Sequence, residues 1–353
     1  MSRPAGLFAL VLAILTLALA GCSESGGAGG RTPGVQTSVA KPSGGPGVLI
    51  IANQQGLVEY RLKDGSTRQL LAPATPSTFL LDPAVSPNGK RLAYIVQPPP
   101  NTQGGRYDAG SDLWVADRDG SNARELVKHF QPNQLIRFPQ WQDNDNVLVI
   151  VQEIGTAGGT TRVDYRLTRV DAASGERTPV RDDVLAFGVS PDATQVAYAK
   201  LSLQSGETLA IFNLAGGDAD RTLVGTDENL APFAYPRWRP DGKQIAFASA
   251  DQTGARLAPG ASTAREVAWS RAAARPAPLL DGLPQDIWTV DPAGGRPVRV
   301  ANLKEDLPAL TWSGDGEHIY VLGTAGLYDV KLKSGAVDRI GEGAFHGQLT
   351  WTP

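Results

Sequence analysis

Residues 235–249 read YPRWRPDGKQIAFAS, in which a Pro-Asp-Gly turn separates two apolar stretches. Asp-Gly is among the strongest short-range signals of a β-hairpin, because Gly tolerates a positive φ and the Asp side chain can bond its own backbone. The stretch recurs, intact or altered, as AVSPNGKRLAYIV (84–96), QWQDNDNVLVIV (140–151), GVSPDATQVAYAK (188–200) and TWSGDGEHIYVL (311–322). It is therefore one unit of a repeat, and it indicates architecture more directly than activity.

Each repeat has the pattern of four short strands. An apolar first strand precedes the turn and a second strand follows it. The third strand has an aromatic or aliphatic centre, as in DLWVAD (112–117) and DIWTVD (286–291), and a Gly turn leads to a short fourth strand. This pattern is typical of a β-propeller blade. Tryptophan recurs at one register of the first strand, which predicts packing between blades, at Trp141, Trp238, Trp312 and Trp351.

The two ends of the repeat region complete each other. Residues 48–71 contain the second, third and fourth strands of a blade without a first, and HGQLTWTP (346–353) is a first strand without successors. Joined, they give six blades in a closed ring, which hides the sheet edges that would otherwise promote aggregation. We therefore predict an all-β, six-bladed β-propeller of four-stranded antiparallel blades at 48–353, closed by the C-terminal strand and carrying an insertion at 251–285.

The repeat resembles that of the TolB-type, WD-repeat-like propellers. The resemblance covers roughly 48–353 and rests on the units W-x-P-D-G-K-x-I-A-F at Trp238 to Phe247 and D-I-W-x-x-D at Asp286 to Asp291. It implies the fold but no single activity, since similar blades occur in TolB, in the propeller halves of oligopeptidases and in surface lipoproteins.

The N-terminus resembles the export signal of a bacterial lipoprotein. Arg3 supplies a positive region, residues 5–20 are apolar, and Leu19-Ala20-Gly21-Cys22 resembles the lipobox. We predict a signal peptide at 1–21, a lipidated Cys22 followed by a flexible Gly/Ser/Pro tether to residue 47, and an extracytoplasmic, membrane-anchored place in the cell envelope. The alternative is a secretory signal with a chance Cys. Because Cys22 is the only Cys, no disulfide is expected.

Composition and motifs argue against several classes of function. The formal net charge of −3 gives no reason to expect nucleic-acid binding, and no later apolar run approaches the length of a membrane span. The sequence contains no G-x-S-x-G elbow, H-E-x-x-H motif or phosphate loop. We therefore predict no catalytic residue, no cofactor and no metal, in a monomeric propeller. His129 and His346 leave a metal pair open, beside the structural role that we prefer, and 143–146 imitates a calcium loop but is interpreted as a turn.

The long insertions fall on one face of the ring. Connections from second to third strands and from each blade to the next lie on what we call the top face, and the tight turns lie on the bottom face. Insertions at 97–111, 153–163 and 251–285 all belong to the top face, which is typical of a binding face. A capping box at Thr263 to Glu266 predicts a short helix, either a partner-binding arm or a lid. The partner-binding candidates are Arg106, Tyr107, Arg265, Trp269, Arg271 and Arg275.

Acidic residues are frequent in the predicted loops between blades. They would surround the mouth of a central channel, where they could bind a cation or a basic segment, receive the Arg-rich insertion, or simply be solvated. These channel-mouth candidates are Asp82, Asp182, Asp183, Asp227, Glu228, Glu305, Asp306 and Glu342.

Two functions follow as expectations. The preferred one is a lipid-anchored module that binds or scaffolds a protein through its membrane-distal top face. The alternative is a small-ligand or cation sensor, or an enzyme, that uses the acidic channel mouth.

Overall fold

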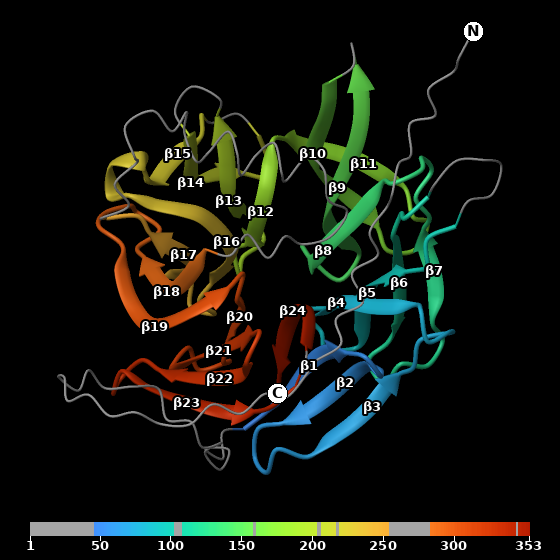
Figure 1. Cartoon of the computed structure of the whole chain (residues 1–353), viewed down its shortest axis with the longest axis horizontal. Helices are drawn as coiled ribbons and strands as arrows, with labels where there is room; N and C mark the ends of the chain where they lie inside the picture. The colour runs from blue at the N-terminus through green and yellow to red at the C-terminus, as the bar shows by residue number, and fades with distance from the viewer. Residues whose placement is uncertain are drawn as a thin grey trace, which may run out of the picture. The chain divides into compact units, whose positions relative to one another are not determined.

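In the computed structural model of the protein, the described residues are 46–101, 108–157, 160–202, 206–216, 219–253, 283–343 and 345–353. They form six four-stranded antiparallel sheets arranged around a common centre (Figure 1). The predicted six-bladed β-propeller is therefore confirmed. Helical structure within the described ranges is confined to the 3-10 turn η2 (Thr226–Glu228), and no helix there is long and apolar enough to cross a membrane.

Three blades occupy the N-terminal half of the ring. The strands of blade 1 are β24 (Phe345–Thr352), β1 (Val48–Asn53), β2 (Gly56–Arg61) and β3 (Thr67–Leu71). Those of blade 2 are β4 (Phe79–Val85), β5 (Arg91–Gln97), β6 (Asp112–Asp117) and β7 (Arg124–Val127). Those of blade 3 are β8 (Leu135–Trp141), β9 (Asn146–Ala157), β10 (Thr160–Asp171) and β11 (Arg177–Asp182).

The other three blades repeat the same order. The strands of blade 4 are β12 (Val184–Val189), β13 (Gln195–Ser202), β14 (Gly206–Asn213) and β15 (Arg221–Val224). Those of blade 5 are β16 (Leu230–Trp238), β17 (Ile245–Asp251), β18 (Pro284–Val290) and β19 (Val298–Asp306). Those of blade 6 are β20 (Ala309–Trp312), β21 (His318–Gly323), β22 (Gly326–Lys331) and β23 (Ala336–Gly341).

The ring is closed as the two ends of the sequence predict. Strand β24 pairs antiparallel with β1, with Val48 opposite Thr352 and Leu49 opposite Trp351. Figure 1 shows the C-terminal strand beside the first strands of the chain. Blade 1 is therefore complete only when both ends contribute, and no inner sheet edge is left open there.

Tryptophans on the inner strands connect neighbouring blades. The indole nitrogen Nε1 of Trp141 donates to the Ala84 carbonyl at 3.0 Å, and that of Trp238 donates to the Gly188 carbonyl at 3.0 Å. Trp312 repeats the bond to the Arg237 carbonyl at 2.9 Å. In each case the acceptor lies one residue before the equivalent position of the preceding blade. The predicted role of these side chains in inter-blade packing is confirmed.

Three inner strands bulge at a residue that precedes proline. The φ angles of Asp82, Phe138 and Tyr235 are 52°, 55° and 48°, and the pairing register with the second strand is interrupted at each place. A bulge of this kind re-aims side chains locally. The motif is visible in the sequence as LDPAV, RFPQW and AYPRW, and it bears on the centre of the ring described below.

The connections between blades are shorter than the sequence predicts, and one insertion is not a loop. Strands β9 and β10 pair continuously, from Asn146 opposite Asp171 to Ala157 opposite Thr160. The supposed top-face loop 153–163 is therefore a hairpin that extends beyond the other strands of its blade. The prediction of a loop was wrong because Thr and Val continue a strand as readily as they end one. The segments 302–306 and 79–83, also expected in loops, belong to β19 and β4.

Candidate functional site

Several predicted site residues lie outside the described residues. These are the lipidation site and all partner-binding candidates, namely Cys22, Arg106, Tyr107, Arg265, Trp269, Arg271 and Arg275. The short helix expected from Thr263 onward lies outside them as well.

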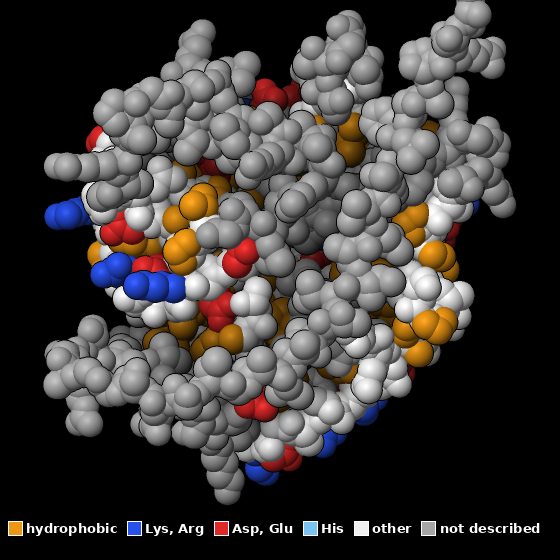
Figure 2. All heavy atoms as spheres, in the orientation of Figure 1, with side chains coloured by type: hydrophobic (Ala, Val, Ile, Leu, Met, Phe, Trp, Pro, Cys, Tyr) orange, Lys and Arg blue, Asp and Glu red, His pale blue; other side chains and the backbone are white. Residues whose placement is uncertain are grey.

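The eight acidic channel-mouth candidates do not form one group. Asp183, Asp227 and Glu342 are exposed on connections and Asp182 is exposed at the end of β11. Glu228 and Asp306 are half-buried, and Asp82 and Glu305 are buried in strands. The Glu305 carboxylate accepts hydrogen bonds from the Thr324 backbone and the Tyr328 hydroxyl, so it holds the β21–β22 turn. On the face seen in Figure 2, acidic side chains are spread among hydrophobic and basic ones and gather into no single patch.

Asp82 lies at the centre of the ring and not at its mouth. Its side chain is completely buried, and its carboxylate forms an ion pair with Arg137 Nε at 2.9 Å. It also accepts hydrogen bonds from the backbone N–H groups of Gln348 and Phe138, at 2.8 Å and 3.3 Å. The prediction of a mouth residue was wrong because the bulge before Pro83 directs Asp82 inward. Its oxygens are already used by these donors.

Gln348 of the closing strand joins further blades across the centre. Its side-chain amide donates to the Pro139 carbonyl at 2.6 Å, and its amide oxygen accepts from Arg237 Nη2 at 2.5 Å. Arg237 also donates to the Phe187 carbonyl at 3.0 Å. Blades 1 to 5 are thus connected through one buried polar network, which we call the central plug: Asp82, Arg137, Gln140, Arg237 and Gln348.

Aromatic rings complete the central plug and make it poorly hydrated. The aromatic rings of Phe138 and Tyr235 pack edge to face near the centre of the propeller, with their centroids 5.6 Å apart. Burial, together with the nearby Asp82 charge, raises the pKa of the Tyr235 hydroxyl above its ordinary value. Burial lowers the pKa of Arg237 to about 10, which still leaves the guanidinium charged at neutral pH. Arg137 Nη2 is buried without a hydrogen-bond partner, but the remaining contacts make the centre resemble a protein interior more than a ligand channel.

His129 is held between two carboxylates on the top face. Its Nδ1 lies 2.5 Å from Asp112 and its Nε2 lies 2.9 Å from Asp108, and the side chain is almost buried. Burial opposes the charged ring, but the two hydrogen bonds outweigh it and raise the pKa of His129. Because both ring nitrogens are hydrogen-bonded, His129 holds Asp108 and Asp112 together where the 97–111 connection enters β6. Within the described ranges no group of three or more His, Cys, Asp or Glu side chains is placed to hold a metal ion.

The turn at 143–146 acts as a turn and not as a calcium loop. The Asp143 carboxylate accepts hydrogen bonds from the backbone N–H groups of Asp145 and Asn146, at 2.7 Å and 2.8 Å. Its oxygens therefore stabilise the β8–β9 hairpin, as the sequence predicts.

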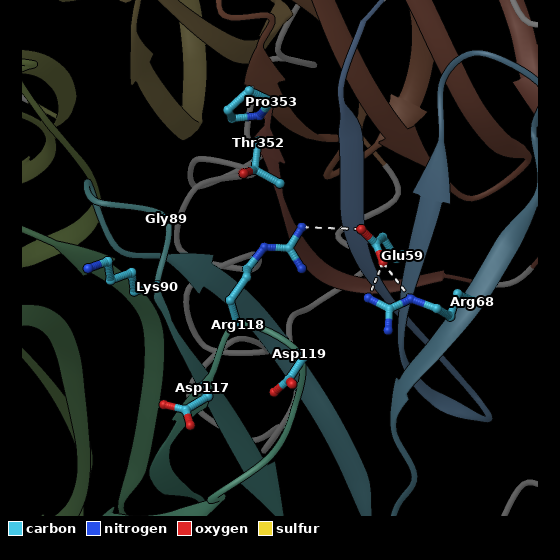
Figure 3. A pocket seen from close by; sticks show the side chains of 9 residues that line it. All are labelled: Glu59, Arg68, Gly89, Lys90, Asp117, Arg118, Asp119, Thr352 and Pro353. Atoms are coloured by element: carbon cyan, nitrogen blue, oxygen red, sulfur yellow. Dashed lines mark hydrogen bonds and ion pairs between the residues drawn. The ribbon is translucent and has the colours of Figure 1, made fainter.

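A pocket of about 590 Å³ opens at the seam between blades 1 and 2, on the bottom face (Figure 3). Strands β2 and β3 contribute Glu59 and Arg68, and the β4–β5 turn contributes Gly89 and Lys90. The β6–β7 turn and the end of β24 complete the lining with Asp117, Arg118, Asp119, Thr352 and Pro353. This pocket was not predicted from the sequence.

Two arginines converge on one carboxylate inside this pocket. Figure 3 shows Arg68 and Arg118 reaching Glu59 from opposite sides. Arg68 binds it through Nε at 2.8 Å and Nη2 at 2.6 Å, whereas Arg118 Nη2 is 3.4 Å away. Burial lowers the pKa of Arg118, and Glu59 offsets this only in part. The charge of Arg118 is therefore only loosely compensated.

The fold is similar to solved propellers at low sequence identity. TolB from Acinetobacter baumannii has a TM-score of 0.57 and 13% identity, over 89% of this chain and 68% of that chain. A protein assigned as TolB from Agrobacterium tumefaciens has a TM-score of 0.49 and 15% identity, over 87% of this chain and 98% of that chain. An oligogalacturonate lyase from Vibrio parahaemolyticus has a TM-score of 0.45 and 13% identity, over 84% of this chain and 74% of that chain.

The TolB structure from Acinetobacter baumannii supports the propeller fold and no more, because so low an identity leaves function open. The other two TM-scores are under 0.5 and add no further support. No family model matches the chain, and the curated proteins contain no match to its sequence.

Proposed function

We propose that the protein is a lipid-anchored, extracytoplasmic binding module that captures a protein partner through its top face. The observation that carries this proposal is the position of the exposed hydrophobic side chains. Of the four large ones found in the described part of the chain, Phe130 and Leu283 lie on top-face connections, Phe79 begins β4 at the top face, and only Val298 lies on the bottom face. Three of the four therefore share one face, and a face that exposes apolar side chains is the better candidate for a protein-binding surface.

The orientation of the chain supports the same face. Strand β1 runs from bottom to top and starts at Val48, so the described part of the chain begins at the bottom face. An anchor on Cys22 would then hold the bottom face toward the membrane and present the top face to partners. The extended β9–β10 hairpin also projects on the top face and adds unpaired backbone at its edges.

The sensor or enzyme alternative receives less support. It needs acidic groups that converge on an open channel, whereas Asp82 is committed to Arg137 and Glu305 to the β21–β22 turn. Among the described candidates, Asp183, Asp227 and Glu228 still lie on connections outside these buried contacts, the last two side by side in η2. Loss of ligand binding in the double variant Asp227→Asn, Glu228→Gln would support the sensor or enzyme alternative.

The proposal is tested by crosslinking and capture from envelope membranes. We expect the intact protein to capture a partner that is lost on deletion of 255–284 or in Phe130→Ala, while the thermal unfolding midpoint is unchanged. Val298→Ala is the matched control, because it removes an equally exposed apolar side chain from the bottom face. Equal capture by all four proteins would contradict a top-face interface.

A further inference from the structure

The propeller repeat provides an internal alignment, and one position departs from it. The aligned residue at the end of the third strand is Leu62, Ala172, Leu214, Pro292 and Leu332 in five blades, but Arg118 in blade 2. The positions are equivalent because the same backbone hydrogen bond recurs. The N–H of Arg118 donates to the Lys90 carbonyl, that of Ala172 to Asp145, and that of Leu332 to Glu317. A position that is otherwise apolar therefore carries a guanidinium.

A purely structural role for Arg118 accounts poorly for this departure. The matching side chains Leu62 and Ala172 are buried and those of the other three blades are partly buried, so Arg118, with its side chain 20% exposed, carries a charge at the margin of the apolar interior. The obvious partner, Glu59, accepts two short bonds from Arg68 on Oε2, and only its Oε1 faces Arg118. The 3.4 Å contact adds little, because hydrogen bonds weaken steeply with distance.

Unused hydrogen-bonding groups line the same pocket. In the described part of the chain, Arg118 makes no side-chain contact besides Glu59, and the Lys90 ammonium makes none. On the other side, Asp119 uses Oδ1 to accept from Ser121, and Asp117 uses Oδ2 to accept from Asn122. Each carboxylate keeps a second oxygen. The lining thus contains unfilled donors and unfilled acceptors, with equal numbers of basic and acidic side chains.

We propose that this pocket binds a small zwitterion, whose oxyanion contacts Arg118 and Lys90 and whose ammonium group faces Asp117 and Asp119. A guanidinium matches the geometry of a carboxylate or phosphate, and paired carboxylates suit an ammonium group. The volume of about 590 Å³ lies within the range of small-molecule sites. The zwitterion is either a free compound or the phosphoethanolamine head group of a lipid. The proposal is independent of the top-face function, since the pocket lies on the bottom face.

Calorimetric titration with O-phosphoethanolamine tests the chemistry directly. We expect it to bind at least about tenfold more tightly than inorganic phosphate or ethanolamine, because each of these fills only half of the site. In Asp119→Asn, this preference over phosphate should shrink while phosphate binding persists. Equal affinities for phosphoethanolamine and phosphate in the unchanged protein would overturn the zwitterion assignment.

Arg118→Leu separates binding from folding, because it places the residue of Leu62, Leu214 and Leu332 at this position. We expect phosphoethanolamine binding to be lost and the thermal unfolding midpoint to be unchanged or raised. Lys243→Gln, at the equivalent of Lys90 in blade 5, is the charge-matched control and should bind normally. A lowered midpoint with normal binding would show Arg118 to be an inter-blade staple, and the proposal would fail.

The source of the zwitterion is decided with vesicles. Sedimentation with phosphatidylethanolamine vesicles, reduced in Arg118→Leu and absent with phosphatidylcholine, would assign a lipid head group, because choline lacks N–H donors. Binding of free phosphoethanolamine without vesicle binding would assign a soluble compound.

Discussion

At the scale of single residues, the central plug shows how polar groups can hold a ring together from inside. Gln348 forms hydrogen bonds with three other blades, through Asp82, Pro139 and Arg237. Buried hydrogen bonds contribute modestly when made, but an unpaired buried group is costly. The main cost of losing Gln348 is therefore expected from its buried partners, which would be left without a hydrogen bond.

Replacing Gln348 with Leu should destabilise the protein by about 2–4 kcal/mol, because the Pro139 carbonyl and Arg237 Nη2 would lose their partner in the interior. Urea unfolding measures the free energy of unfolding. Gln69→Leu is the matched control, because exposed Gln69 makes a comparable 2.6 Å bond to the Gln55 carbonyl in contact with water. Equal losses in both variants would show that burial is not the cause.

The pair of hydrogen bonds at His129 predicts a pH dependence with a definite sign. Because the folded state raises the pKa of His129, its contribution to stability is complete below about pH 6.5, the ordinary value, and is lost as the pH rises through the folded pKa. Burial disfavours the Asp108 carboxylate, but its hydrogen bonds, the first of them from His129, outweigh burial and lower the pKa of Asp108. The contribution of Asp108 to stability is therefore lost as the pH falls through this lowered pKa.

The measurement is the free energy of unfolding against pH, for the unchanged protein and for His129→Gln. We expect the difference to be about 1 kcal/mol near pH 6 and to shrink at higher pH. A difference that grows above pH 7 would mean that the neutral ring is the stabilising form.

At the scale of elements, neighbouring blades are joined by one recurring bond. Trp141, Trp238 and Trp312 each pack on the preceding blade and donate to one of its carbonyls, as Trp312 does to Arg237. Trp351 in β24 occupies the same register, but its Nε1 is buried without a partner. The seam between blades 6 and 1 thus has the packing without the hydrogen bond.

This difference predicts unequal effects of the same substitution. Trp312→Phe should cost about 1–2 kcal/mol more than Trp351→Phe, because only the former leaves a carbonyl unpaired. Paired denaturation curves of the two variants provide the measurement. A larger loss for Trp351→Phe would indicate that ring contacts, and not the indole N–H, set the strength of the seams.

The blades could be predicted from the sequence because their turns and strand periods are local patterns. The Pro-Asp-Gly turn and the Trp register are sufficient to count six units. The candidate sites could not be predicted equally well. Asp82 seemed to belong to a loop, yet the bulge before Pro83 turns it inward, and its partner Arg137 comes from another blade. The pocket depends on Arg118, whose signal is visible only when the blades are aligned with each other.

At the scale of the whole molecule, the ring depends on a single closing strand. Strand β24 supplies the inner strand of blade 1, the Gln348 contacts and the packing of Trp351 against the β20–β21 turn at Gly314. Its removal would open β1 to solvent and break the central plug at once.

A chain ending at residue 343 should therefore lose its cooperative thermal transition. Adding the peptide FHGQLTWTP (345–353) should restore part of it, because the peptide can pair with the exposed edge of β1. A scrambled peptide of the same composition is the control. Cooperative unfolding of the truncated chain alone would show that the ring is stable without the inner strand of blade 1.

Closure between Val48 and Thr352 also has a consequence for the order of events after synthesis. Blades 2 to 6 each consist of consecutive strands and can form as the chain emerges, whereas blade 1 must wait for the last residues. Contacts between such distant parts of a chain are slow to form. Until they do, β1 presents an unpaired edge, and a chaperone that covers this edge would protect the newly made protein until the ring can close.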